Sequence, residues 1–216
     1  MSFLKSLFKK DNNQSNNNRQ LKSPHDLKTG DIIVLSDSFA LPEQLRAQEF
    51  QVKATSSYEF EHKVQKEWAL ASSSGDELYL SLDVDDKTYL KFSLKINHDE
   101  VESLFDLDEF ATIFDEPGDA FLTRQSDTSS TSNWSSPEYQ QSIFAKVGYF
   151  HRKDHDEEAL SQYEGKEGGE QFELYVLYDQ EQSRGIDIEV WQDGDTDVFL
   201  TLFRPLTDIT DMYPGS

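Results

Sequence analysis

The chain has 216 residues, of which 36% are hydrophobic, and it carries a formal net charge of −22. This length allows one domain or two small ones, each with a buried core. An acidic surface repels nucleic-acid phosphates, so we expect no nucleic-acid partner, and the absence of cysteine excludes disulfides, thiolate metal sites and cysteine nucleophiles.

The N-terminal arm differs in charge from the rest of the chain. Residues 1–30 hold six basic and two acidic side chains, whereas the remainder holds 14 basic and 40 acidic ones. Apolar side chains recur at helical spacing beside lysines, which favours weak contact with an anionic membrane or with a partner groove. The competing interpretation is a frayed tail, because so short a helix is marginal in water. The residues concerned are Phe3, Leu4, Lys5, Leu7, Phe8, Lys9 and Lys10.

The arm is followed by a polar, asparagine-rich run, so residues 1–26 are predicted to be a flexible basic arm and linker. Its apolar stretch is shorter than the core of a secretory signal, and no other stretch reaches the length of a membrane span. We therefore expect a cytoplasmic protein that contacts the inner membrane peripherally through this arm.

Residues 27–118 are predicted to form a first β-rich unit. Strands are expected at 32–35, 50–54 and 67–71, and a hairpin is expected from two strands that begin at Leu78 and Leu90. In this hairpin leucines alternate with polar residues at a period of two, which indicates a half-buried antiparallel pair. We expect the leucine face to point into the core and the polar face to point into solvent.

Short helical patterns follow the hairpin, and Pro117-Gly118 ends them. Residues 119–142 are then predicted to be a linker or loop, because 125–136 are rich in serine and threonine. Trp134 within this run is interpreted as an anchor packed on a neighbouring element, with an exposed contact as the alternative.

Residues 143–216 are predicted to form a second β-rich unit. Strands at 172–178, 186–191 and 198–203 repeat the order of strands, turns and charges in residues 67–104. The predicted fold is therefore mainly β, of the α+β kind with minor short helices. It consists of two related antiparallel β-meander or small-barrel units.

Two groups of residues are weak candidates for metal ligands. Asp193, Asp195 and Asp197 begin like a calcium-binding EF-hand loop, but the sixth position is Val198 and the twelfth is Arg204, so an acidic hairpin turn fits better.

His151 and His155 have the spacing of two ligands on a helix, but they follow a strand and lack a third ligand. We interpret them as surface histidines in a charged loop, and we expect no metal and no cofactor. Carboxylates are too numerous for a catalytic pair to be singled out, and no nucleophile or phosphate-binding motif is present.

Several short motifs together resemble the bacterial family known as domain of unknown function 4178, over about residues 27–213. They are Gly30-Asp31, Glu67-Trp68-Ala69-Leu70, Glu77-Leu78-Tyr79-Leu80, Val147-Gly148-Tyr149-Phe150, the strand from Ile186 to Val190, and Arg204-Pro205-Leu206. That family has no established activity, so the resemblance implies an accessory role only.

The leading hypothesis is a non-enzymatic interaction protein whose acidic body binds an unknown, basic protein partner. One alternative is an enzyme with an unrecognised carboxylate or histidine site, which a deep pocket with convergent carboxylates and histidines would favour. Another is an acidic mimic of nucleic acid, which rows of carboxylates at phosphate spacing would favour.

Overall fold

The computed structural model describes residues 19–71, 75–154 and 168–215. Within these residues the chain forms a mostly antiparallel β structure with two short α-helices. The strands are β1 (Ile32–Leu35), β2 (Glu49–Phe60), β3 (Lys63–Ala71), β4 (Leu78–Val84), β5 (Thr88–Ile96), β6 (Phe121–Thr123), β7 (Glu138–His151), β8 (Glu170–Tyr178), β9 (Arg184–Trp191), β10 (Thr196–Pro205) and β11 (Ile209–Tyr213). The helices are α1 (His98–Leu104) and α2 (Leu107–Ala111), and three 3₁₀ turns are η1 (Pro24–Asp26), η2 (Thr112–Phe114) and η3 (Leu206–Asp208).

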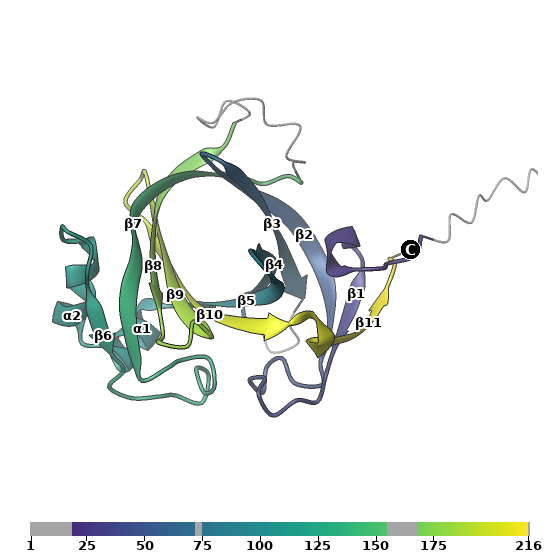
Figure 1. Cartoon of the computed structure of the whole chain (residues 1–216), viewed down its shortest axis with the longest axis horizontal. Helices are drawn as coiled ribbons and strands as arrows, with labels where there is room; N and C mark the ends of the chain where they lie inside the picture. Colours follow the sequence, from purple (N-terminus) through teal and green to yellow (C-terminus); the bar gives the residue numbers. More distant parts are fainter. Residues whose placement is uncertain (1–18, 72–74, 155–167, 216) are drawn as a thin grey trace, which may run out of the picture.

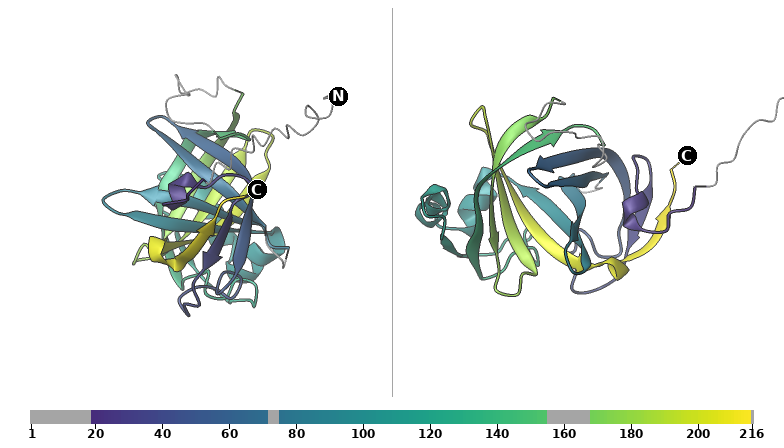
Figure 2. Two further views of the ribbon diagram at one scale, coloured as in Figure 1. Left: turned by 90° about the vertical axis from the view of Figure 1, so that its right-hand side faces the viewer. Right: turned by 45° about the horizontal axis from the view of Figure 1, so that its top comes forward.

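All the strands belong to one sheet, in the order β11-β1-β2-β3-β4-β5-β10-β9-β8-β7-β6. An additional pairing between β2 and β7 closes the eight strands from β2 to β7 in this order into a barrel (Figure 1). The other three strands flank the barrel: β1 and β11 extend the sheet beside the start of β2, and β6 lies beside the start of β7. Figure 2 shows the barrel from two further directions.

The predicted mainly-β fold is confirmed, and both halves contain the expected meander of three strands. One is β3-β4-β5 and the other is β8-β9-β10. The last strands of the two meanders pair with each other along eight residues, from Val198 opposite Ile96 to Pro205 opposite Tyr89. The two halves are therefore parts of one sheet, and their common origin stays a prediction.

The barrel closes because its two longest strands bend. The register of β2 shifts between Val52 and Ala54, and β7 has two such shifts, with Ala145 at a φ of 47°. Bulges of this kind bend a strand and increase its twist. As a result each of these strands pairs with a flanking strand in its first half and with its barrel partner in its second half.

The two faces of the barrel strands are covered differently from the prediction. Leucine-face residues such as Leu80, Phe92 and Leu200 belong to one buried cluster with flanking residues such as Ile33 and Trp134. This apolar face is covered by segments outside the ring. The predicted solvent face, by contrast, lines the inside of the barrel, because the sheet curls around it.

Helices α1 and α2 lie outside the ring beside β7 and β8 (Figure 1). Asn97 caps α1 and accepts a hydrogen bond from the Glu100 backbone, as the sequence predicts for such a cap. Aromatic rings join these helical segments to the barrel: the centroids of Phe105 and Tyr139 are 6.0 Å apart. Within the described residues, no helix is long and apolar enough to cross a membrane.

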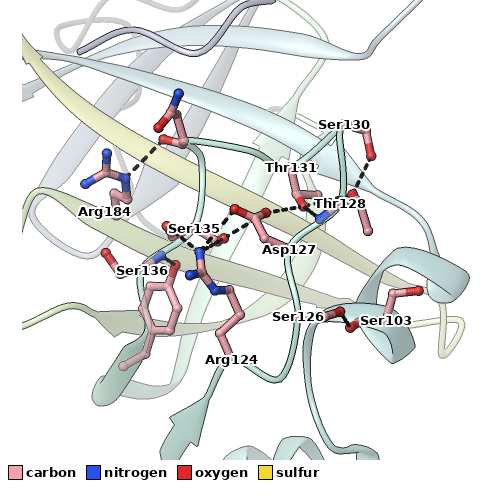
Figure 3. A network of polar contacts seen from close by, with 12 residues as sticks. Ser103, Arg124, Ser126, Asp127, Thr128, Ser130, Thr131, Ser135, Ser136 and Arg184 are labelled. Carbon is pink, nitrogen blue, oxygen red and sulfur yellow. Dashed lines mark hydrogen bonds and ion pairs between the residues drawn. The ribbon is translucent and has the colours of Figure 1, made fainter. Parts of the chain in front are cut away.

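Residues 119–142 differ from the predicted linker, because they include β6 and the start of β7. The serine- and threonine-rich run is held by its own polar contacts (Figure 3). Arg124 donates to the Ser135 hydroxyl at 2.9 Å, and the Thr131 hydroxyl donates to Asp127 at 2.8 Å. Trp134 is fully buried and donates to the Gln44 side chain, which confirms its interpretation as an anchor.

Candidate ligand site in the barrel lumen

Three adjoining cavities follow the inside of the barrel. The central cavity, of about 180 Å³, is lined by side chains from all eight barrel strands. The mouth cavity, of about 890 Å³, opens beside the β9–β10 hairpin and shares Tyr58, Glu67, Glu189 and Phe199 with the central one. The far cavity, of about 510 Å³, lies beside the β4–β5 hairpin at the other end. The barrel therefore has a hollow lumen that side chains fill only in part.

Charged side chains meet in the middle of this lumen. Lys91 of β5 forms an ion pair with the Oδ2 atom of Asp187 of β9. Glu67 of β3 and Glu189 of β9 line the same cavity as Asp187. All three acidic residues are less than a tenth exposed. We call Glu67, Lys91, Asp187 and Glu189 the central charge cluster.

Burial dominates the electrostatics of the two glutamates in this cluster. It raises the pKa of Glu67 to about 7, an effect that Lys91 opposes and Asp187 reinforces. Burial and then the charge of Glu67 raise the pKa of Glu189 well above its usual value. The Tyr58 hydroxyl lies near both glutamates and acts in the opposite direction, lowering their pKa values. Although Lys91 lies nearby, both glutamates therefore ionise less readily than an exposed carboxyl group.

Aromatic rings cover one side of the lumen next to the glutamates. The ring of Tyr58 lies 5.1 Å from that of Phe150 and 5.5 Å from that of Phe172, between centroids. Trp191 packs on the same group, with its centroid 5.4 Å from Phe172. Tyr58, Phe150, Phe172 and Trp191 are called the aromatic wall. Gly148 permits this packing, since a Cβ there would lie 2.6 Å from the Phe172 ring.

The mouth cavity is acidic at its rim. Glu77, Asp193 and Asp195 line it, and all three are exposed. Among its described lining residues the two basic side chains are paired with carboxylates: Lys95 lies 2.8 Å from Asp197, and Arg152 lies 3.0 Å from Glu170. The rim therefore keeps an excess of negative charge.

The acidic candidates from the sequence occupy the β9–β10 turn and its edge. Gly194 has a φ of +95° between Asp193 and Asp195, as a tight hairpin turn requires. Asp197 accepts a hydrogen bond from the Trp191 indole besides its ion pair with Lys95. Among the described residues no group of three or more histidine, aspartate or glutamate side chains is placed so that it could hold a metal ion.

The prediction of a surface position for His151 is wrong. Its ring is buried at the end of β7, and its Nε2 atom lies 2.9 Å from Oε2 of Glu59 on β2. The strand carries it into the closing seam of the barrel instead of into the loop. His155 and the arm residues from Phe3 to Lys10 lie outside the described residues.

Sequence reasoning missed the central charge cluster. Lys91, Asp187 and Glu189 alternate with apolar residues, and Glu67 precedes Trp68, which is also the pattern of strands with one face in solvent. One signal was present: Trp191, Phe199 and Phe203 share the polar face with the carboxylates. Large aromatic rings on such a face suggest that it is covered.

Comparison with family models, with curated proteins and with solved structures finds no match for this chain. The resemblance to domain of unknown function 4178 stays a prediction.

Proposed function

We propose that this protein is a non-enzymatic binding protein that holds a small organic ligand in the lumen of its barrel. The observation that carries the proposal is the lumen itself, with a mouth cavity of about 890 Å³ that adjoins a central cavity of buried polar groups. Concave sites with a few convergent polar groups among aromatic rings are typical of ligand binding. Small closed barrels of eight strands are wide enough to hold one such ligand.

The proposal refines the accessory role expected from the sequence. The contacts with a basic protein partner, the cytoplasmic location and the weak membrane contact of the arm are further expectations that are compatible with it. In this scheme the lumen binds the ligand, while the acidic outer surface and the arm determine where the protein acts.

An enzyme is the second candidate, and one observation favours it. A buried glutamate whose pKa is about 7, such as Glu67, is suited to exchange protons near neutral pH. Glu189 beside it would be the partner carboxyl group. The described lining of the lumen includes no histidine, so any such chemistry would depend on these carboxylates.

A lumen-filling variant tests the binding function. Ser93 lines the central cavity, whereas Ser142 is exposed on β7. A thermal-shift screen with small amines, carboxylates, sugars and neutral aromatic compounds should identify compounds that stabilise the native protein and Ser142→Phe but do not stabilise Ser93→Phe. Circular dichroism checks that both variants fold. If no compound shifts the melting temperature, or if each one acts equally on Ser93→Phe, the lumen is not a ligand site.

A fluorescence readout locates the ligand. Trp191 lines the mouth cavity, while Trp68 and Trp134 are fully buried in the core outside the ring. A ligand in the lumen should change the emission of the native protein and leave that of Trp191→Phe nearly unchanged. Turnover of a bound compound, lost in Glu67→Gln, would support the enzyme instead.

A further inference from the structure

We propose that the ligand of the lumen is an organic amine, whose ammonium group lies among Glu67, Asp187 and Glu189 and whose apolar or aromatic body lies against the aromatic wall. This inference rests on the function proposed above and adds the chemical class of the ligand. Four features of the lumen support it: an acceptor without a partner, clustered carboxylates, aromatic rings and the charge of the rim.

The acceptor is the Oδ1 atom of Asp187. Its Oδ2 atom binds Lys91, but within the described part of the chain Oδ1 has no hydrogen-bond partner although the residue is only 7% exposed. Buried carboxylate oxygens almost always accept a hydrogen bond, and leaving one without a donor is costly. An N–H group of a ligand in the central cavity would satisfy this atom.

The carboxylates give the site its preference for a cation. The described lining of the central cavity holds four acidic side chains and three lysines, and three of the acidic ones, Glu67, Asp187 and Glu189, belong to the central charge cluster. Of the lysines, Lys91 is already paired with Asp187 and Lys146 lies over the Phe60 ring. After burial, the charge of Glu67 raises the pKa of Glu189, and the charge of Asp187 raises the pKa values of both glutamates. A positive charge between them would stabilise both ionised forms, since an opposite charge within a few ångströms favours the charged state of a carboxyl group.

The aromatic wall selects an organic cation over a metal ion. Tyr58 belongs to this wall and lines the same cavities as Glu67 and Glu189, so the aromatic rings adjoin the carboxylates. Aromatic faces attract ammonium groups and bury the carbon atoms attached to them. A bare metal ion would use neither property.

The acidic rim acts at longer range. Glu77, Asp193 and Asp195 lie at the mouth, so a positively charged ligand meets an attractive potential before it enters. Such a rim raises the local concentration of cations and repels anions. Entry should therefore slow as salt is added.

Calorimetry with matched probes on the full-length protein tests the inference. 2-Phenylethylamine and hexylamine supply an ammonium group with N–H donors, 2-phenylethanol removes the charge, and 3-phenylpropanoate reverses it. A trimethylammonium analogue keeps the charge and removes the N–H groups. At pH 8 we expect one amine bound per chain, and each of the other three probes should bind roughly tenfold or more weakly.

Isosteric variants provide the second arm of the test. Glu67→Gln and Asp187→Asn should each weaken amine binding roughly tenfold, whereas Glu49→Gln, an exposed change on β2, should leave it unchanged. The comparison of probes on the native protein stays decisive even if a variant fails to fold.

The possible outcomes distinguish a failure of the amine proposal from a failure of the proposed binding function. Equal or tighter binding of the alcohol or the carboxylate overturns the amine class but leaves a ligand site in the lumen. Equal binding of the trimethylammonium probe overturns the role of Asp187 as acceptor. If amines do not bind but another class of compound binds and its binding is lost in Ser93→Phe, the binding function is supported and the amine proposal is not. If nothing binds, both proposals fall.

Discussion

Glu59 of β2 and His151 of β7 form a buried pair, with 2.9 Å between the carboxylate and the imidazole, on the two strands that close the barrel. The β2–β7 seam contains only three paired positions among the described residues, from Ser57 to Glu59 opposite Tyr149 to His151. Gly169 leaves space for the imidazole, because a Cβ there would lie 2.8 Å from it. A polar pair thus lies at the shortest pairing of the ring.

Glu59→Leu should destabilise the fold. It removes the carboxylate that faces the buried His151 ring, and a buried polar group that loses a partner costs about 1–3 kcal/mol. Urea unfolding followed by circular dichroism measures the loss. Glu49→Leu, at an exposed position of the same strand, is the control. Equal midpoints for the two variants would show that the pair does not hold the seam.

Lys91 and Asp187 should behave as a coupled pair. Lys91→Met leaves the Asp187 carboxylate buried without its cation, which typically costs about 3–5 kcal/mol. The double variant Lys91→Met with Asp187→Leu removes both charges, so it should recover a large part of this loss. The double-mutant cycle compares the free energies of unfolding of the native protein, Lys91→Met, Asp187→Leu and the double variant. Additive losses in the double variant would contradict the coupling.

Stability should fall as the pH rises from about 5 to 8, in part because of Glu67. Its pKa is raised from the usual value of 4.5 to about 7 in the folded protein. Between these values the folded state binds more protons than the unfolded state, so its contribution is fully present below pH 4.5 and is lost as the pH passes 7. Lys91, Asp187, Glu189, Ser56 and Tyr58 surround this group and set the shift.

Glu67→Gln isolates that contribution from the general repulsion of an acidic protein. The variant cannot ionise, so its stability relative to the native protein should rise between pH 5 and pH 8. Urea unfolding at both values gives the difference. A difference that does not change with pH would mean that Glu67 keeps an ordinary pKa.

The strands could be predicted because their alternation is local: leucines in β4 and β5 indicate strand and register from neighbouring residues alone. Closure of the barrel could not, since it depends on bulges in β2 and β7 that bring residues 57–59 to residues 149–151. Without closure the polar face of each strand belongs in solvent, which is why Glu67 and Glu189 could not be distinguished from other carboxylates. His151 was misplaced for the same reason.

Vesicle binding should depend on the N-terminal arm. Lys5, Lys9 and Lys10 each contribute about 1 kcal/mol near an anionic surface, and Phe3, Leu4, Leu7 and Phe8 add apolar burial. The acidic remainder of the chain opposes contact, so binding should be weak and should fall as salt shortens the Debye length below about 8 Å. Co-sedimentation with anionic vesicles compares the full chain with a deletion of residues 1–18, which keeps the ion pair between Arg19 and Asp31. Replacing the three lysines with glutamate should abolish binding, and sedimentation that is the same for all three proteins would leave the arm without a role at membranes.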